Sequence, residues 1–160
     1  MTDDELELVL THQQTPMFRM ALLALGDVAA AQDAVASAML NVWERARSHD
    51  VENVGGYLRV AVLNEIRNDS RRRRRAVRAW SRAASRHHTD DHATLIVARE
   101  QIQAALQQLP RDQRLCVVLR HYVGLDVAET AALLDAPHGT VTSWTARGLD
   151  RLRSQLEMTQ

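Results

Sequence analysis

Apolar residues recur every three or four positions along most of this 160-residue chain, and this spacing constrains the fold more than any other feature. Leu58, Val62 and Ile66 follow it, at intervals of four residues. There is no strand-like alternation, and only six glycines and three prolines interrupt the pattern. The chain is therefore predicted to be all-α. The expected helices cover residues 15–25, 29–47, 57–74, 93–109, 112–122, 127–134 and 138–156.

The periodicity is lost between residues 76 and 92, where Ser, His and Asp collect. This break predicts two small helical modules, residues 1–75 and 100–160, joined by a flexible linker over 76–99. His and Asp side chains at positions 87, 88 and 90–92 are of the types that bind zinc. Because they fall in the expected linker, without an ordered scaffold, we expect no metal site and no cofactor.

The net charge of zero hides a strong segregation of charge along the chain. All twenty basic residues are Arg. Residues 67–86 hold nine Arg and one acid, a net charge of +8. Residues 1–66 hold four Arg and ten acids (−6), and residues 87–160 hold seven Arg and nine acids (−2). Such a concentrated basic block suggests a polyanion site, and a solvated linker is the competing interpretation.

A helix-turn-helix is predicted near the C-terminus. Asp126 and Glu129 have the spacing of a capping box at the start of a short helix, which is followed by a turn over 135–137 and a longer helix from His138. On that longer helix, Val141, Thr145, Gly148, Leu149, Leu152 and Leu156 share one face. Gly139, Ser143, Ala146, Arg147 and Asp150 lie opposite. An ordinary antiparallel helix pair with a polar outer face remains an alternative.

Several functions are excluded by what the chain lacks. It has no glycine-rich phosphate loop, no carboxylate pair on a rigid scaffold and no credible Ser-His or Cys-His arrangement, so we expect no catalytic residue and no enzyme. The single cysteine, Cys116, lies in an apolar run and is predicted to be buried. No apolar run approaches the ~20 residues that cross a membrane, and the first residues are acidic. We therefore expect no membrane insertion and a cytoplasmic protein.

Five segments together resemble the extracytoplasmic-function (ECF) sigma factors, the sigma-70-type initiation factors of bacterial RNA polymerase. The first two, residues 26–43 and 57–75, are similar to the second conserved region of that family. The others, residues 106–114, 124–134 and 139–153, are similar to its fourth region. The resemblance implies a transcription initiation factor that binds core RNA polymerase and directs it to promoters. Its implied partners are the polymerase clamp helices and flap, promoter DNA and an anti-sigma factor.

The resemblance also implies roles for individual residues. Polymerase contact would fall on Asp33, Leu40 and Trp43. The minus-ten element would be bound by Asn53, Asn64, Arg67, Asn68, Arg71, Arg72, Arg73 and Arg74. The minus-thirty-five element would be bound by Thr140, Thr142, Ser143, Trp144, Arg147 and Arg151.

This sequence departs from the family pattern in two places. Ala36 and Ser37 stand where the family usually has Gln followed by an acidic residue, and Thr142 and Trp144 stand where it often has cations. The loss of two cations predicts weaker phosphate attraction at the minus-thirty-five site.

Two other functional classes are compatible with the same features. One is a helix-turn-helix regulator that binds DNA without a sigma role and acts as a dimer. The other is a helical interaction protein whose Arg run binds an acidic partner. Promoter-specific initiation by core polymerase in the presence of the chain distinguishes the sigma factor from both.

Overall fold

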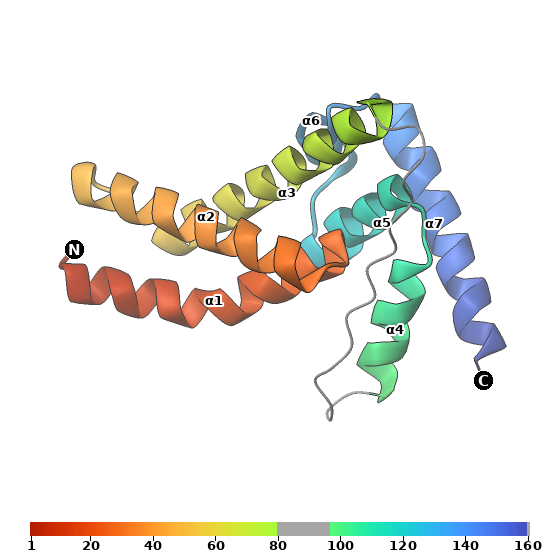
Figure 1. The fold of residues 1–160 in the computed structure, drawn as a ribbon, viewed down its shortest axis with the longest axis horizontal. Helices are drawn as coiled ribbons and strands as arrows, with labels where there is room; N and C mark the ends of the chain where they lie inside the picture. Colours follow the sequence, from red (N-terminus) through yellow and green to blue (C-terminus); the bar gives the residue numbers. More distant parts are fainter. Residues whose placement is uncertain (80–96, 160) are drawn as a thin grey trace. The chain divides into compact units, whose positions relative to one another are not determined.

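The computed structural model describes residues 1–79 and 97–159, and these form helices in two compact units (Figure 1). The first unit is built on α1 (Asp3–Leu25), α2 (Val28–Ser48) and α3 (Val54–Ala79). The second is built on α4 (Val97–Gln107), α5 (Arg111–Val117), the π-helix η1 (Val118–Val123), α6 (Val127–Leu134) and α7 (His138–Met158). The prediction of an all-α chain with two helical modules is confirmed. Residues 80–96, which include most of the expected linker and the His/Asp cluster, lie outside the described residues.

The core of the first unit is formed by buried apolar side chains of α1, α2 and α3, and α2 packs along α3. The Asp27 carboxylate caps α2 by accepting a hydrogen bond of 2.8 Å from the Ala30 amide. Small side chains on α2 let α3 approach closely. The α3 residues that meet them, Leu58, Val62 and Ile66, are fully buried, and each such side chain contributes about 1.5–3 kcal/mol.

Helix α1 begins much earlier than the sequence predicted. The prediction placed its start at residue 15. In the structure the helix begins at Asp3 and continues through Pro16. Thr2 and Glu5 form the reciprocal hydrogen bonds of a capping box, at 2.8 and 3.2 Å, and the bond from the Thr2 amide lowers the pKa of the Glu5 carboxyl. Burial of apolar side chains of the added turns, such as Leu6, stabilises this extension.

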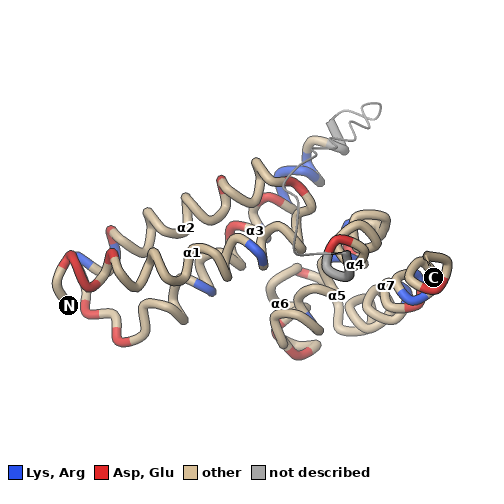
Figure 2. The backbone as a smooth tube through the Cα atoms, turned by 90° about the horizontal axis from the view of Figure 1, so that it is seen from below, with Lys and Arg blue, Asp and Glu red and all other residues tan. Residues whose placement is uncertain are grey.

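Helix α3 also extends beyond its predicted end. We expected it to stop at Arg74, and it continues to Ala79. Arginine is a good helix former, so a run of arginines favours continuation of a helix and does not interrupt it. The arginine run therefore lies on a helix over its whole length, at the end of the unit remote from the N-terminus of the chain (Figure 2).

The second unit is organised around α7, which packs against α4, α5 and α6. Its core includes the fully buried Leu115, Leu119 and Val141. Cys116 is also fully buried, as predicted. Among the residues described in both units, no helix is long and apolar enough to cross a membrane.

The helix predicted over residues 112–122 is divided in the structure. It is α-helical to Val117 and then widens into the π-helix η1. Gly124 ends η1 with a φ of 86°, a left-handed conformation that glycine adopts without steric cost. The amide of Leu125 donates to the Leu119 carbonyl at 2.9 Å, and the Arg120 guanidinium donates to the Leu125 carbonyl at 2.8 Å. These bonds fix the chain reversal into α6.

Gly148 is expected to be required for the packing of α5 against α7. A β-carbon at this position would lie 2.7 Å from Val117 Cγ2 and 3.1 Å from the Gln113 carbonyl oxygen. Overpacking of this kind typically costs about 1–3 kcal/mol. Alanine is the better helix former by only about 1 kcal/mol, so Gly148→Ala should lower the free energy of unfolding. Urea unfolding of the full chain measures the change.

Gly139→Ala is the matched control on the same helix, because a β-carbon there would meet no atom within 4 Å. This variant should be as stable as the parent or more so. Equal stability of the two variants would contradict the packing argument.

Candidate nucleic-acid interface

The helix-turn-helix predicted from the sequence is present in the second unit. Asp126 and Glu129 form the expected capping box: the Asp126 carboxylate accepts from the Glu129 amide at 2.7 Å, and the Glu129 carboxylate accepts from the Asp126 amide at 2.8 Å. Asp135 then leaves α6 in the left-handed conformation, with a φ of 54°. Pro137 precedes the first residue of α7. A short helix, a tight turn and a longer helix are thus held together by local capping.

Helix α7 has the two faces that the sequence predicted. Val141, Thr145 and Gly148 are buried, and the Thr145 hydroxyl donates to the Val141 carbonyl at 2.7 Å. On the opposite side, Arg147 and Asp150 are exposed to solvent. An exposed polar face on the second helix of such a motif is the geometry with which proteins enter the major groove.

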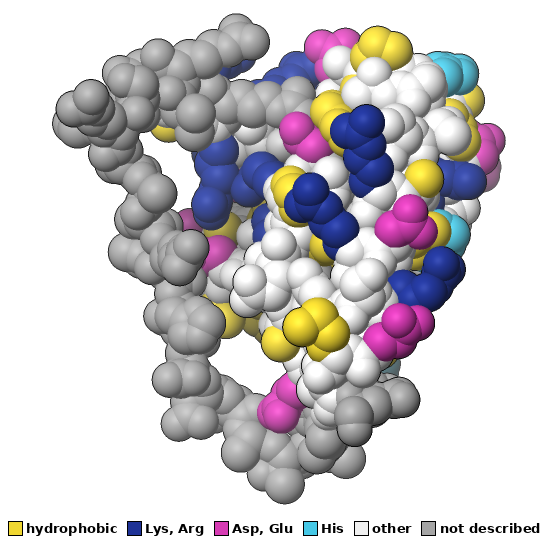
Figure 3. All heavy atoms as spheres, turned by 90° about the vertical axis from the view of Figure 1, so that its right-hand side faces the viewer, with side chains coloured by type: hydrophobic (Ala, Val, Ile, Leu, Met, Phe, Trp, Pro, Cys, Tyr) yellow, Lys and Arg dark blue, Asp and Glu magenta, His cyan; other side chains and the backbone are white. Residues whose placement is uncertain are grey.

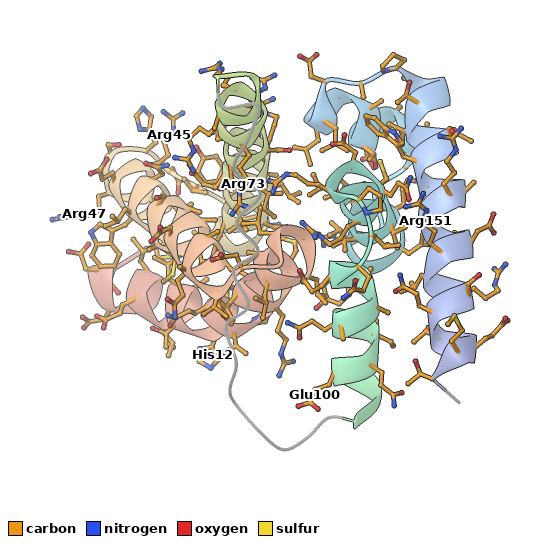
Figure 4. All side chains as sticks on the ribbon, turned by 45° about the vertical axis from the view of Figure 1, so that its right-hand side comes forward. His12, Arg45, Arg47, Arg73, Glu100 and Arg151 are labelled. Carbon is orange, nitrogen blue, oxygen red and sulfur yellow. The ribbon has the colours of Figure 1, made fainter. Side chains whose placement is uncertain are left out.

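All six residues expected at the minus-thirty-five element lie on α7. Thr142, Arg147 and Arg151 are exposed, and Thr140, Ser143 and Trp144 are half-buried. The Thr142 hydroxyl donates a hydrogen bond to the His138 carbonyl at 3.1 Å. The hydroxyl oxygen of Thr142 can still accept a hydrogen bond. Figure 4 labels Arg151 on this helix.

Acidic side chains are interspersed with the arginines on this side of the second unit (Figure 3). Asp150 and Arg153 approach to 3.7 Å, with both side chains more than two-thirds exposed. An exposed pair of this kind contributes little to stability, but it reduces the positive potential of the helix surface.

A second polar face lies on α3 of the first unit. Asn64, Arg67, Asn68, Arg71 and Arg75 follow each other at helical spacing, on the side away from the buried apolar stripe. Asn68 and Arg75 are exposed, and the other three are partly buried. The structure thus brings onto one helix face four of the residues expected at the minus-ten element.

Arg72 and Arg73 do not share that face. Arg73 continues the stripe of Ile66 and Asp69, and both arginines form ion pairs with the Asp69 carboxylate. The nitrogen–oxygen distances are 3.2 Å from Arg73 Nε and 3.9 Å from Arg72 Nη2. The sequence prediction treated the run as uniform and gave Asp69 no role. The spacing of three and four residues was the signal that could have identified these pairs.

Two further members of the expected minus-ten set have different surroundings. The side chain of Arg74 lies outside the described residues. Asn53 is exposed in the turn before α3, and its side-chain oxygen Oδ1 accepts a hydrogen bond from the Gly56 amide at 2.8 Å. This bond makes Asn53 a cap of α3.

The three residues expected at the polymerase lie on the outer side of α2. Leu40 is 64% exposed, Asp33 is exposed and Trp43 is half-buried. Ala34, Val35, Ala38 and Val42 form the buried side of the same helix. The structure thus places all three residues on the side of α2 opposite its buried stripe.

Comparisons with known proteins give the family. Residues 99–152 match the family described as Sigma-70, region 4. The chain is 30% identical over 154 residues to the RNA polymerase sigma-E factor of Streptomyces avermitilis, covering 96% of this chain and 86% of that protein. It is 30% identical over 153 residues to the sigma-E factor of Streptomyces coelicolor, covering 95% and 86%.

The fold has a counterpart among solved structures. The sigma factor RpoE, in a co-crystal structure with the anti-sigma factor NepR from Bartonella quintana, has a TM-score of 0.59 and 24% identity, covering 98% of this chain and 97% of that one. This likeness concerns the fold alone. Together with the sequence relatives, it agrees with the two helical modules described above. The chain belongs to the ECF-type sigma factors and is a non-enzymatic initiation factor that directs RNA polymerase to promoters.

Proposed function

We propose that this sigma factor divides promoter recognition between two helix faces, with α7 reading the minus-thirty-five element and α3 binding the minus-ten element. Residues 1–75 form the minus-ten and polymerase-binding module, residues 100–160 form the minus-thirty-five module, and residues 76–99 link them. The observation that carries this proposal is the exposed polar face of α7 within a capped helix-turn-helix, inside the segment that matches Sigma-70, region 4.

On α7, the exposed Arg147 and Arg151 hold the DNA backbone, and the short polar side chains approach the bases. Thr140, Thr142 and Ser143 can reach base edges without steric hindrance, and Trp144 packs beside them. The acidic Asp150 on the same helix weakens the attraction. Stable binding of this module to DNA therefore depends on the polymerase.

On α3, recognition and phosphate binding occur along one helix. Asn64 and Asn68 offer both donor and acceptor groups to bases, and Arg67 and Arg71 beside them bind phosphates. Arg72, Arg73 and Arg74 extend the positive potential along the upstream DNA. Asn53 supports this site from the preceding turn, where it caps the helix.

On α2, the exposed patch of Asp33, Leu40 and Trp43 binds the clamp helices of the polymerase, while the second unit contacts the flap. We further propose that an anti-sigma factor restrains this chain, as NepR binds RpoE in the structural neighbour. Since the chain acts on chromosomal DNA, we place its activity in the cytoplasm.

Transcription by core polymerase with the added chain tests the proposal, with the 5′ ends of the products sequenced to recover the promoters. The chain should give new initiation sites that share two sequence elements at a fixed separation. Retention of those sites after deletion of the minus-thirty-five-like element would contradict the role given to α7.

Neutralising the polar face of α3 should weaken promoter binding by holoenzyme at every sequence alike. Each lost phosphate contact reduces the salt slope of log affinity by about 0.9. The double variant Arg71→Gln and Arg75→Gln should therefore reduce it by nearly two. Fluorescence titration of promoter DNA at several salt concentrations measures the slope.

Arg19→Gln, an exposed substitution on α1, is the matched control and should leave the slope unchanged. An unchanged slope for the α3 double variant would contradict phosphate binding by Arg71 and Arg75.

A further inference from the structure

Asp69 is the single acid among the nine arginines of residues 67–86, and its side chain is better shielded from water than those of the two arginines with which it pairs. Its side chain is 15% exposed, whereas those of Arg73 and Arg72 are 47% and 69% exposed. Because water screens a partly buried carboxylate less than an exposed one, its attraction for these arginines is stronger than that of a surface pair. The nitrogen–oxygen distance of 3.2 Å to Arg73 is that of a direct ion pair.

The position of Asp69 on the helix determines where it holds these arginines. Asp69 follows Ile66 by three residues and precedes Arg73 by four, so the three lie along one side of α3. That side is the continuation of the buried stripe. Arg71 and Arg75 lie on the opposite side, with the asparagines. The ion pair therefore draws Arg73 toward the core side of α3 and away from the polar face.

We propose that Asp69 is a positioning residue that withholds Arg73 and Arg72 from the DNA backbone and so limits sequence-independent binding by this sigma factor. An arginine that binds a phosphate must first leave Asp69, or it brings the carboxylate charge with it. In either case its net contribution to DNA affinity is reduced. The base-reading groups of α3 then account for a larger share of the affinity, which favours correct promoters over other DNA.

This proposal rests on the proposed function, since it assumes that α3 lies along DNA. The predicted effect on DNA affinity is opposite in sign to that of replacing Arg71 and Arg75. Removal of the Asp69 charge should strengthen DNA binding. Each arginine that is released to a phosphate should steepen the salt slope by about 0.9, which is about a threefold larger loss of affinity between 50 and 200 mM salt.

The test uses holoenzyme made from the full chain, with two duplexes: a promoter recovered by 5′-end sequencing and a scrambled duplex of the same length and composition. Asp69→Asn should bind both more tightly at low salt, with a steeper slope, and the ratio of the two affinities should fall. Asp69→Glu keeps the charge and should retain the parent slope. Adding Arg73→Gln to Asp69→Asn should remove most of the increase.

Asp3→Asn makes the same change of net charge at the other end of the unit, where Asp3 lies 3.7 Å from the exposed Arg47. A rise in slope as large for Asp3→Asn as for Asp69→Asn would attribute the effect to net charge and overturn the proposal. A slope for Asp69→Asn that is unchanged or shallower, with or without a lower melting temperature, would also overturn it.

If Arg71→Gln with Arg75→Gln leaves the slope unchanged, the proposed role of α3 fails. If that variant lowers the slope and Asp69→Asn does not raise it, only the role of Asp69 fails.

Discussion

Replacing Leu40 with Asp is expected to depress transcription from every promoter, because the variant chain should bind core polymerase much more weakly. Leu40 is 64% exposed on the outer side of α2, where the large apolar side chain is in contact with water in the isolated protein. Covering it with a partner contributes favourable free energy, and placing a carboxylate in the same interface reverses that contribution. Loss of a central interface residue typically costs 2 kcal/mol or more, which is about a thirtyfold weaker complex. Titration of labelled full-length chain with core polymerase measures the affinity.

Leu8→Asp is the matched control for that experiment. Leu8 is 60% exposed on α1, so the substitution changes apolar area and charge by nearly the same amount outside the proposed polymerase surface. Both variants should melt close to the parent temperature, because neither side chain belongs to the core. Equal losses of polymerase affinity from the two substitutions would assign the effect to charge alone. They would contradict the proposal that this surface of α2 binds the polymerase.

The elements that could be predicted accurately from the sequence are those whose ends depend on local chemistry. Helix α6 begins directly after Asp126, whose capping box with Glu129 marks the first turn, and α7 begins after Pro137, so short-range signals set both boundaries. The apolar face of α7 followed from periodicity alone. Helix α1 was predicted to begin only at residue 15, whereas burial of apolar side chains such as Leu6 and Leu10 stabilises the turns before it.

The candidate site was predicted as a set of residues but not as an arrangement. The sequence places five consecutive arginines after Ser70, and the helix distributes them around its circumference. Which of them face the polar side depends on where α2 covers α3, and this is a tertiary property. The burial of Asp69 follows from the same packing and could not be deduced from its own neighbours. The π-helix η1 is likewise a departure that periodicity does not reveal, because the residues on both sides of it are helical.

Asn64→Ala distinguishes a residue that reads a base from one that supports the helix. Asn64 is half-buried on the polar face of α3, beside Arg67 and Asn68. An asparagine amide can donate to and accept from one base edge, and loss of such a pair of bonds costs about 1–3 kcal/mol of discrimination. The variant should therefore lose about 5- to 150-fold in activity on the native minus-ten sequence. It should bind core polymerase as the parent does.

Promoter variants provide the control that this experiment needs. When the base read by Asn64 has already been replaced, Asn64→Ala should have little additional effect, since the lost hydrogen bonds are absent in both cases. A structural asparagine would behave differently, because a half-buried amide that stabilises α3 supports the whole site. Its loss would lower the melting temperature and depress initiation at every promoter by the same factor. Two measurements separate these outcomes: transcription of the native and base-substituted promoters by parent and variant holoenzyme, and thermal unfolding of the two chains. A uniform loss of initiation with a lower melting temperature would show that Asn64 has a structural role.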